Sequence, residues 1–165
     1  MSHPLVEQLR FTRSEWVRGL EGVSVEEAAR RFEPMNSIAW IIGHLAWQEQ
    51  AYWLQRAQGR TISPVAERCG FGEPASTPPL AEAWAAWRAV TTAADAYLDS
   101  LTIDSLQVKW EREPTSETPG TKLLRTTYHY WFHLGEAQAI RQLLGHTKLP
   151  TFVGDISKAP YRPDR

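Results

Sequence analysis

One segment, residues 38–57, constrains the fold of this chain more than any other. Its first ten residues are apolar, with His44 among them, and the helical pattern continues to the end of the segment. Asn36 and Ser37 can cap its start and Gly59 can cap its end, so the segment is predicted to be one long helix. Because its first three turns are apolar on nearly all sides, this helix must be buried against several neighbours at once.

The rest of the chain supplies those neighbours. Apolar residues recur at steps of three and four over residues 5–20, 80–101 and 121–144, which predicts three further long helices. A capping-box pattern that begins at Ser24 predicts a short helix over residues 25–32. The predicted fold class is therefore all-α, in the form of a four-helix bundle with one long crossover connection.

Two irregular segments and a tail join or follow these helices. Residues 59–79 are rich in Gly and Pro and form the expected crossover, whereas the alternation over residues 106–110 is consistent with a short strand. Residues 1–147 are expected to form the bundle, and residues 148–165 an extended tail that packs on the bundle or on a dimer partner. The tail carries three apolar side chains whose exposure would create an apolar patch: Phe152, Val153 and Ile156.

Composition and charge narrow the range of functions. Apolar residues make up 42% of the chain and charged residues 22%, which is typical of a folded globular protein. The 18 Lys and Arg residues balance 19 Asp and Glu residues, so binding to nucleic acid or to an anionic membrane is not expected. The longest apolar run is about half of what a membrane span requires. A single cysteine excludes an intrachain disulfide and the amino end has no recognisable secretory signal, so we expect a cytoplasmic protein.

Three of the five histidines fall on faces that are predicted to be buried. His129 and His133 are four residues apart, so they lie one above the other on a face of the last long helix that continues with apolar residues. His44 lies within the most buried helix. A lone buried histidine is usually a hydrogen-bonded core residue, but two at this spacing and a third on a neighbouring inward face form a possible ligand set. Neutral imidazole suits Zn, Ni, Cu or Fe, and three protein ligands leave one position open, as in catalytic zinc sites.

Other chemistries find less support in the sequence. It lacks the Glu-x-x-His pair of di-iron bundles and the H-E-x-x-H spacing of zinc proteases. Cys69 lies in a Gly-rich connection with no activating partner beside it, so it is interpreted as a small loop residue.

Two parts of the sequence resemble the DinB-like superfamily: a helix that starts at Asn36 and Ser37 and carries His44, and the pair His129 and His133 ahead of the run GEAQAIRQLLG. The resemblance extends over the whole chain and is most specific in the last long helix. It implies a four-helix bundle with one long crossover, usually a homodimer, that holds Zn or Ni through the three histidines. It also implies a chemistry, because related members are thiol-dependent S-transferases or isomerases.

We therefore expect a metal-dependent transferase, isomerase or hydrolase in which the three histidines bind one divalent ion that activates a thiol or a water molecule. The partner would be a small-molecule substrate, with a low-molecular-weight thiol as a co-substrate. Gln48 and Glu136 are candidate catalytic residues, since each could hold the second ring nitrogen of a histidine or accept a proton; the alternative is an ordinary polar residue on the flank of the bundle. By helical phase, five side chains are expected to line the pocket: Thr12, Trp40, Trp47, Trp87 and Thr91.

Two other interpretations stay open at this point. The chain could be a non-enzymatic protein that binds a small molecule or a metal in a stress response, or a structural dimer whose core histidines are satisfied without a metal. Ligand binding without turnover would indicate the first of these, and a complete lack of metal binding would indicate the second.

Overall fold

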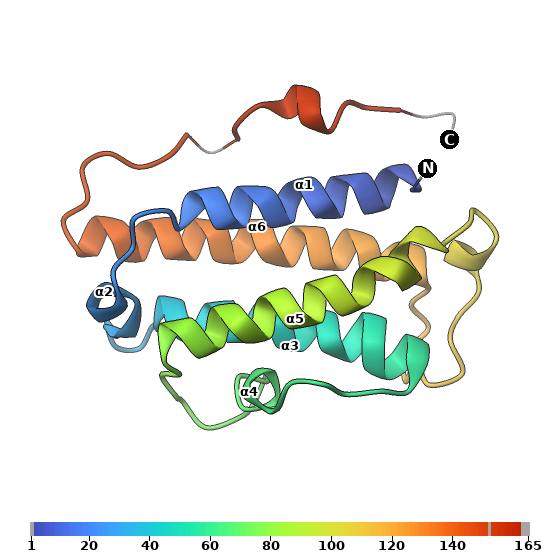
Figure 1. Cartoon of the computed structure of the whole chain (residues 1–165), viewed down its shortest axis with the longest axis horizontal. Helices are drawn as coiled ribbons and strands as arrows, with labels where there is room; N and C mark the ends of the chain where they lie inside the picture. Colours follow the sequence, from blue (N-terminus) through green and yellow to red (C-terminus); the bar gives the residue numbers. More distant parts are fainter. Residues whose placement is uncertain (1, 152, 163–165) are drawn as a thin grey trace. The chain divides into compact units, whose positions relative to one another are not determined.

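Every regular element in the described chain, which comprises residues 2–151 and 153–162 of a computed structural model, is a helix (Figure 1). In chain order the elements are α1 (Pro4–Gly19), α2 (Val25–Ala29), α3 (Ile38–Glu49), the π-helix η1 (Gln50–Arg56), α4 (Pro64–Glu67), α5 (Leu80–Asp99), the 3-10 helix η2 (Ser105–Gln107), α6 (Pro119–Leu143) and the 3-10 helix η3 (Ile156–Lys158). The all-α prediction is confirmed. The short strand expected over residues 106–110 is wrong, because η2 covers the start of this segment and residues 108–110 are not part of a strand. No helix in these residues combines the length and apolarity that crossing a membrane would require.

Contacts along the chain divide it into two compact units. The first combines residues 1–22 with residues 98–165, and the second consists of residues 23–97. The four long helices are divided between the two units: α1 and α6 belong to the first, and α3 and nearly all of α5 to the second. Their arrangement as one four-helix bundle stays a prediction.

In the first unit, α1 and α6 pack against each other (Figure 1). Both begin with proline in the first turn after a capping side chain, supplied by His3 for α1 and by Thr118 for α6. Trp16 of α1 and Tyr130 of α6 are both fully buried, and their rings meet edge to face with centroids 6.3 Å apart. Such pairs combine a large buried apolar area with a favourable ring geometry. The contact between Trp16 and Tyr130 therefore favours packing of the apolar stripe of α1 against that of α6.

The carboxyl end of α1 is fixed to α6 through the backbone of Gly19. Its carbonyl oxygen accepts hydrogen bonds from Gln138 Nε2, at 2.9 Å, and from the buried guanidinium of Arg141. A side chain at residue 19 would collide with Leu134 of α6. The last turn of α1 can therefore approach α6 closely only because this residue is glycine.

A buried cluster of charges fixes the irregular segment ahead of α6. Lys122 is 1% exposed and Glu113 is 3% exposed, and Nζ of Lys122 lies 3.3 Å from Oε1 of Glu113. The same Nζ contacts Glu117, which also pairs with Arg125. The hydroxyl of Thr115 donates to Glu113 at 2.7 Å. Charged hydrogen bonds centred on the buried pair Lys122 and Glu113 thus hold the first turns of α6 and the segment before them.

The tail of the first unit runs beside α1 (Figure 1). Gln8 Nε2 donates to the carbonyl of Ala159 at 2.8 Å, and the amide of Gly154 donates to Glu15 at 2.7 Å. Arg18 bridges Glu15 and the carbonyl oxygen of Thr151. These contacts are polar. Of the apolar tail residues, Ile156 is 57% exposed and Val153 is half-buried, whereas Phe152 lies outside the described residues.

In the second unit, α2 and α4 both contact α3. The capping box predicted at the start of α2 is confirmed, because Ser24 and Glu27 each accept from the other's backbone amide. The predicted helix over residues 38–57 starts after the N-cap Ser37 as expected. It then continues as η1 and ends near Gly59, whose φ of 72° suits only glycine well.

The connection over residues 59–79 is not wholly irregular, because it contains α4. One side chain, Gln50, holds its start. Gln50 Oε1 accepts from the amides of Ile62 and Ser63 at 2.9 and 2.8 Å. Its Nε2 donates to the carbonyl of Ser63 at 3.2 Å and to Glu67 at 2.6 Å. The buried amide group of Gln50 therefore uses all of its usual hydrogen-bonding capacity on this connection.

Candidate metal centre

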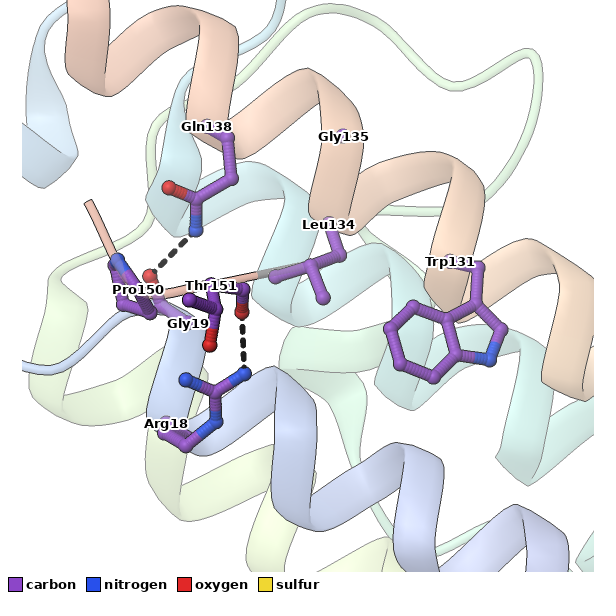
Figure 2. Close-up of a pocket in the computed structure, with 8 residues that line it drawn as sticks. All are labelled: Arg18, Gly19, Trp131, Leu134, Gly135, Gln138, Pro150 and Thr151. Carbon is purple, nitrogen blue, oxygen red and sulfur yellow. Dashed lines mark hydrogen bonds between the residues drawn. The ribbon is translucent and has the colours of Figure 1, made fainter. Parts of the chain in front are cut away.

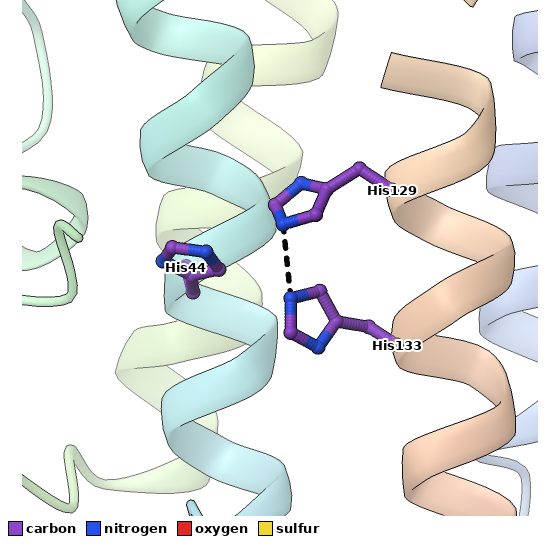
Figure 3. Close-up of side chains that lie close together, drawn as sticks. All are labelled: His44, His129 and His133. Atoms are coloured by element: carbon purple, nitrogen blue, oxygen red, sulfur yellow. Dashed lines mark hydrogen bonds between the residues drawn. The ribbon is translucent and has the colours of Figure 1, made fainter. Parts of the chain in front are cut away.

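The contact between His129 and His133 is the centre of the candidate site in the first unit (Figure 3). The two residues are one turn apart on α6, and their Nε2 atoms lie 2.9 Å from each other. The rings meet edge to face with centroids 4.5 Å apart. His133 is buried and His129 is half-buried. Two imidazole nitrogens are thus directed at the same point of an interior face, as the spacing of the two histidines predicts.

The second ring nitrogen of His133 is held by Glu136. Nδ1 of His133 lies 2.7 Å from Oε2 of this carboxylate, three residues further along the helix. Because an ionised carboxylate only accepts hydrogen bonds, the proton of the neutral ring resides on Nδ1. The Nε2 atom of His133 then carries a lone pair, which is the form in which histidine binds metals.

His44 lies in the second unit, on α3 (Figure 3). Its Nδ1 atom lies 2.7 Å from the carbonyl oxygen of Cys69. A carbonyl oxygen can only accept, so Nδ1 of His44 donates and Nε2 of the neutral ring carries the lone pair. His44 and His133 are therefore both held in the tautomer that leaves Nε2 able to bind a cation.

Two tryptophans of α3 enclose the His44 ring. Trp40 stacks on it with centroids 4.5 Å apart and an interplanar angle of 13°, and Trp47 stacks on it at 5.2 Å and 20°. The three residues occupy successive turns of one helix face. This arrangement limits rotation of the imidazole and covers both of its faces with apolar surface.

Gln48, the residue after Trp47, lies one turn beyond His44 and is 8% exposed. Its Oε1 atom is buried and, among the described residues, accepts no hydrogen bond; the Nε1 atom of Trp40 is likewise buried without an acceptor. Gln48 does not hold the second nitrogen of His44, because the Cys69 carbonyl does so. An unsatisfied buried amide oxygen is costly, and in native structures it is often explained by a ligand, an ion or a water molecule.

The other residues expected in a pocket are placed as follows. The hydroxyls of Thr12 and Thr91 are buried and donate to carbonyls of their own helices, Gln8 O and Trp87 O, both at 2.9 Å. Trp87 meets Trp84 edge to face with centroids 5.5 Å apart. Of the expected pocket residues, Trp40 and Trp47 stack on a predicted ligand, His44.

A small cavity of about 110 Å³ lies in the first unit, between α1, α6 and the start of the tail (Figure 2). Its lining is mainly apolar and includes Trp131, Leu134 and Pro150, with Arg18 and Gln138 at its polar side. None of the three histidines and none of the expected pocket residues lines this cavity. It is therefore a separate feature of the first unit.

Sequence reasoning missed the role of Cys69. This residue is buried, and burial is the main reason that the pKa of its thiol is raised above the usual value. A protonated, enclosed thiol is a poor nucleophile. Cys69 contributes to the site through its backbone carbonyl. Every residue has such a carbonyl, so the residue type at this position does not predict the contact.

A family model described as the DinB superfamily matches residues 8–137, a range that contains all three histidines. Comparison with curated proteins and with solved structures gave no match. Because the family model matches more than half of the chain, the chain belongs to the DinB superfamily.

Proposed function

We propose that His44, His129 and His133 together bind one divalent metal ion, Zn or Ni, and that the chain is an enzyme that uses this ion. The observation that carries the proposal is the convergence of the Nε2 atoms of His129 and His133 on an interior helix face. Each of the three histidines offers one ring nitrogen as a possible ligand atom. Membership of the DinB superfamily supports the same ligand set.

The donor groups suit such an ion. Imidazole nitrogen is a good ligand for Zn, Ni, Cu and Fe, whereas Mg and Ca prefer oxygen. Protein hydrogen bonds hold Nδ1 of His44 and of His133, which is the common pattern around histidine ligands of metals. These two residues therefore need no change of tautomer to bind a metal.

The reaction that we propose is activation of a thiol or of water for attack on a small-molecule substrate, in a thiol-dependent S-transferase, an isomerase or a hydrolase. A divalent ion with three protein ligands lowers the pKa of a thiol or water that occupies its open position, and so supplies a nucleophile at neutral pH. Glu136 keeps the proton on Nδ1 of His133. The buried Oε1 atom of Gln48 is available to accept a hydrogen bond from the substrate.

The first test is metal content, measured by elemental analysis of untagged protein, because a His tag would bind metal itself. We expect about one Zn or Ni per chain. His44→Ala and His133→Ala should each lose the metal while the circular dichroism spectrum stays helical. Protein that remains free of metal after incubation with Zn and Ni would contradict the proposal, as would a His133→Ala variant that keeps one metal ion per chain.

A second candidate function, a non-enzymatic binding protein in a stress response, shares the metal site and differs in turnover. The two are distinguished by a panel of low-molecular-weight thiols and electrophilic substrates. Consumption of substrate that depends on the metal supports the enzyme. Tight binding of a compound from the panel without its consumption favours the binding protein.

The resemblance also leads us to propose a homodimer, and the single cysteine leads us to propose a cytoplasmic location. Size-exclusion chromatography with light scattering measures the oligomeric state. A molar mass of twice the 18.8 kDa chain is expected, and a mass of one chain at all concentrations would contradict the dimer.

A further inference from the structure

Gly43, the residue immediately before His44, has the side chain of Cys69 directly against it. A Cβ atom added at residue 43 would lie 2.5 Å from Sγ and 3.1 Å from Cβ of Cys69. Real side chains do not approach each other to 2.5 Å, and the interior is too densely packed for an easy shift. Any side chain at residue 43 would therefore push Cys69 away from α3.

Cys69 also makes the polar contact to His44. Its carbonyl oxygen lies 2.7 Å from Nδ1 of the imidazole. Two consecutive residues of α3 thus contact Cys69. Gly43 lies against the Cys69 side chain, and His44 donates a hydrogen bond to the Cys69 carbonyl. Movement of Cys69 away from Gly43 would lengthen the hydrogen bond to His44, because both contacts are made along one short stretch of helix.

The backbone around Cys69 is itself well held. The amide of Cys69 donates to the carbonyl of Ala66 at 2.9 Å, in the turn that ends α4. The start of α4 is capped by Ser63, which Gln50 binds from η1. The carbonyl of Cys69 therefore has a defined position against α3, and the hydrogen bond to His44 does not depend on a mobile loop.

We infer that Gly43 and Cys69 are positioning residues for His44. The missing side chain at residue 43 lets Cys69 lie against α3, and the Cys69 carbonyl then keeps the His44 proton on Nδ1 and presents Nε2 as the ligand atom. The effect on metal affinity rests on the proposed function; the effect on the tautomer of His44 does not.

The metal-affinity test uses a pair of compensating substitutions. Gly43→Ala should weaken Zn binding by about 10- to 100-fold, the usual cost of disturbing a group that orients a metal ligand. Cys69→Ala keeps the carbonyl and should bind Zn like the wild type. The double variant Gly43→Ala/Cys69→Ala lacks the Sγ atom that would collide with the new Cβ, so it should recover most of the lost affinity.

Affinity is measured by competition with a chelator of known strength, and urea unfolding is measured for each variant. Gly135→Ala is the matched control, because Gly135 is also inside a long helix and a Cβ there meets nothing within 4 Å. It should bind Zn like the wild type. Wild-type affinity in Gly43→Ala, or a double variant as weak as Gly43→Ala alone, would overturn the inference.

The tautomer of His44 gives a readout that requires neither metal nor activity. In metal-free protein with ¹⁵N-labelled histidine, NMR should show the His44 proton on Nδ1 in the wild type and in Cys69→Ala. Gly43→Ala should lose this preference. A wild-type protein with the proton on Nε2 would overturn the inference even if it binds Zn. A wild-type protein with the proton on Nδ1 that never binds metal would instead contradict the proposed function.

Discussion

Nδ1 of His133 lies 2.7 Å from Oε2 of Glu136, one turn further along α6, so a carboxylate orients the imidazole that is proposed to bind the metal. Glu136→Ala removes this acceptor and should weaken Zn binding by about 10- to 100-fold. Glu136→Gln keeps an acceptor oxygen without the charge and should lose less. Chelator competition measures both. The control is Glu82→Ala, an exposed residue of α5 that should leave the affinity unchanged. Equal affinity in Glu136→Ala and the wild type would contradict this role.

The buried pair Lys122 and Glu113 should matter for stability rather than for metal binding. Lys122→Met leaves the Glu113 carboxylate buried without its cation, and we expect a loss of about 3–5 kcal/mol in the free energy of unfolding. The double variant Lys122→Met/Glu113→Leu removes both charges and should lose less than Lys122→Met alone.

Arg125→Ala is the comparison for this pair. The Arg125 side chain is half exposed and pairs with Glu117, so its removal should cost at most about 1 kcal/mol. Urea unfolding of the three variants provides the measurement. A loss in Lys122→Met no larger than in Arg125→Ala would show that the buried pair is not a major source of stability.

Acid should weaken the contact between α1 and the tail. Hydrogen bonds from Arg18 and from the amide of Gly154 hold the pKa of Glu15 below its usual value of 4.5, and the Arg18 contribution is the largest. A carboxylate with a lowered pKa stabilises the folded state fully above its unfolded pKa, and this contribution is lost as the pH falls. The free energy of unfolding should therefore decrease as the pH is lowered from about 4.5 through the folded pKa of Glu15.

The measurement for this prediction is urea unfolding at a series of pH values between 6 and 3. Glu15→Gln should be less stable than the wild type at pH 6, and its stability should fall less steeply on acidification. Glu21→Gln changes an exposed residue near the end of α1 and should retain the wild-type slope. Identical slopes in Glu15→Gln and the wild type would contradict the assignment.

Two glycines that face different surroundings should respond in opposite directions to alanine. Gly135 lies in the interior of α6 with open space at its Cβ position, so Gly135→Ala should raise the free energy of unfolding by up to about 1 kcal/mol. At Gly19 a Cβ would collide with Leu134, so Gly19→Ala should lower it. Thermal and urea unfolding distinguish these outcomes, and stabilisation by Gly19→Ala would show that the end of α1 can move away from α6 at little cost.

The long helices could be predicted from the sequence because each has both a periodic apolar stripe and a cap. Ser37 before α3 and Gly145 after α6, with φ of 93°, occupy the positions at which helices start and stop. The π-helix η1 could not be predicted, because apolar residues simply continue from α3 into it and a change in helical pitch leaves no mark in composition. The helix α4 is four residues long, which is too short for a periodic pattern.

The candidate site could be predicted only where side chains carry the information. The spacing of His129 and His133 predicted that they lie one above the other on one helix face, and in the structure their Nε2 atoms lie 2.9 Å apart. The partner of His44 could not be found in this way, because a carbonyl oxygen is present at every residue and only the path of the connection selects Cys69. The need for glycine at residue 43 is also not predictable from the sequence, because it depends on how Cys69 lies against α3.

The connection that carries α4 is attached to the continuous helix α3–η1 at two places. At the start of η1 the side-chain amide of Gln50 binds the backbone of Ile62 and Ser63. Two turns earlier, on α3, His44 donates to the carbonyl of Cys69 and Gly43 lies against its side chain. A segment attached at two separate levels can neither slide along the helix nor peel away from one end while the other stays bound. Its backbone amides should consequently exchange with deuterated solvent as one cooperative opening unit, and the surroundings of His44 would open only when that whole unit does.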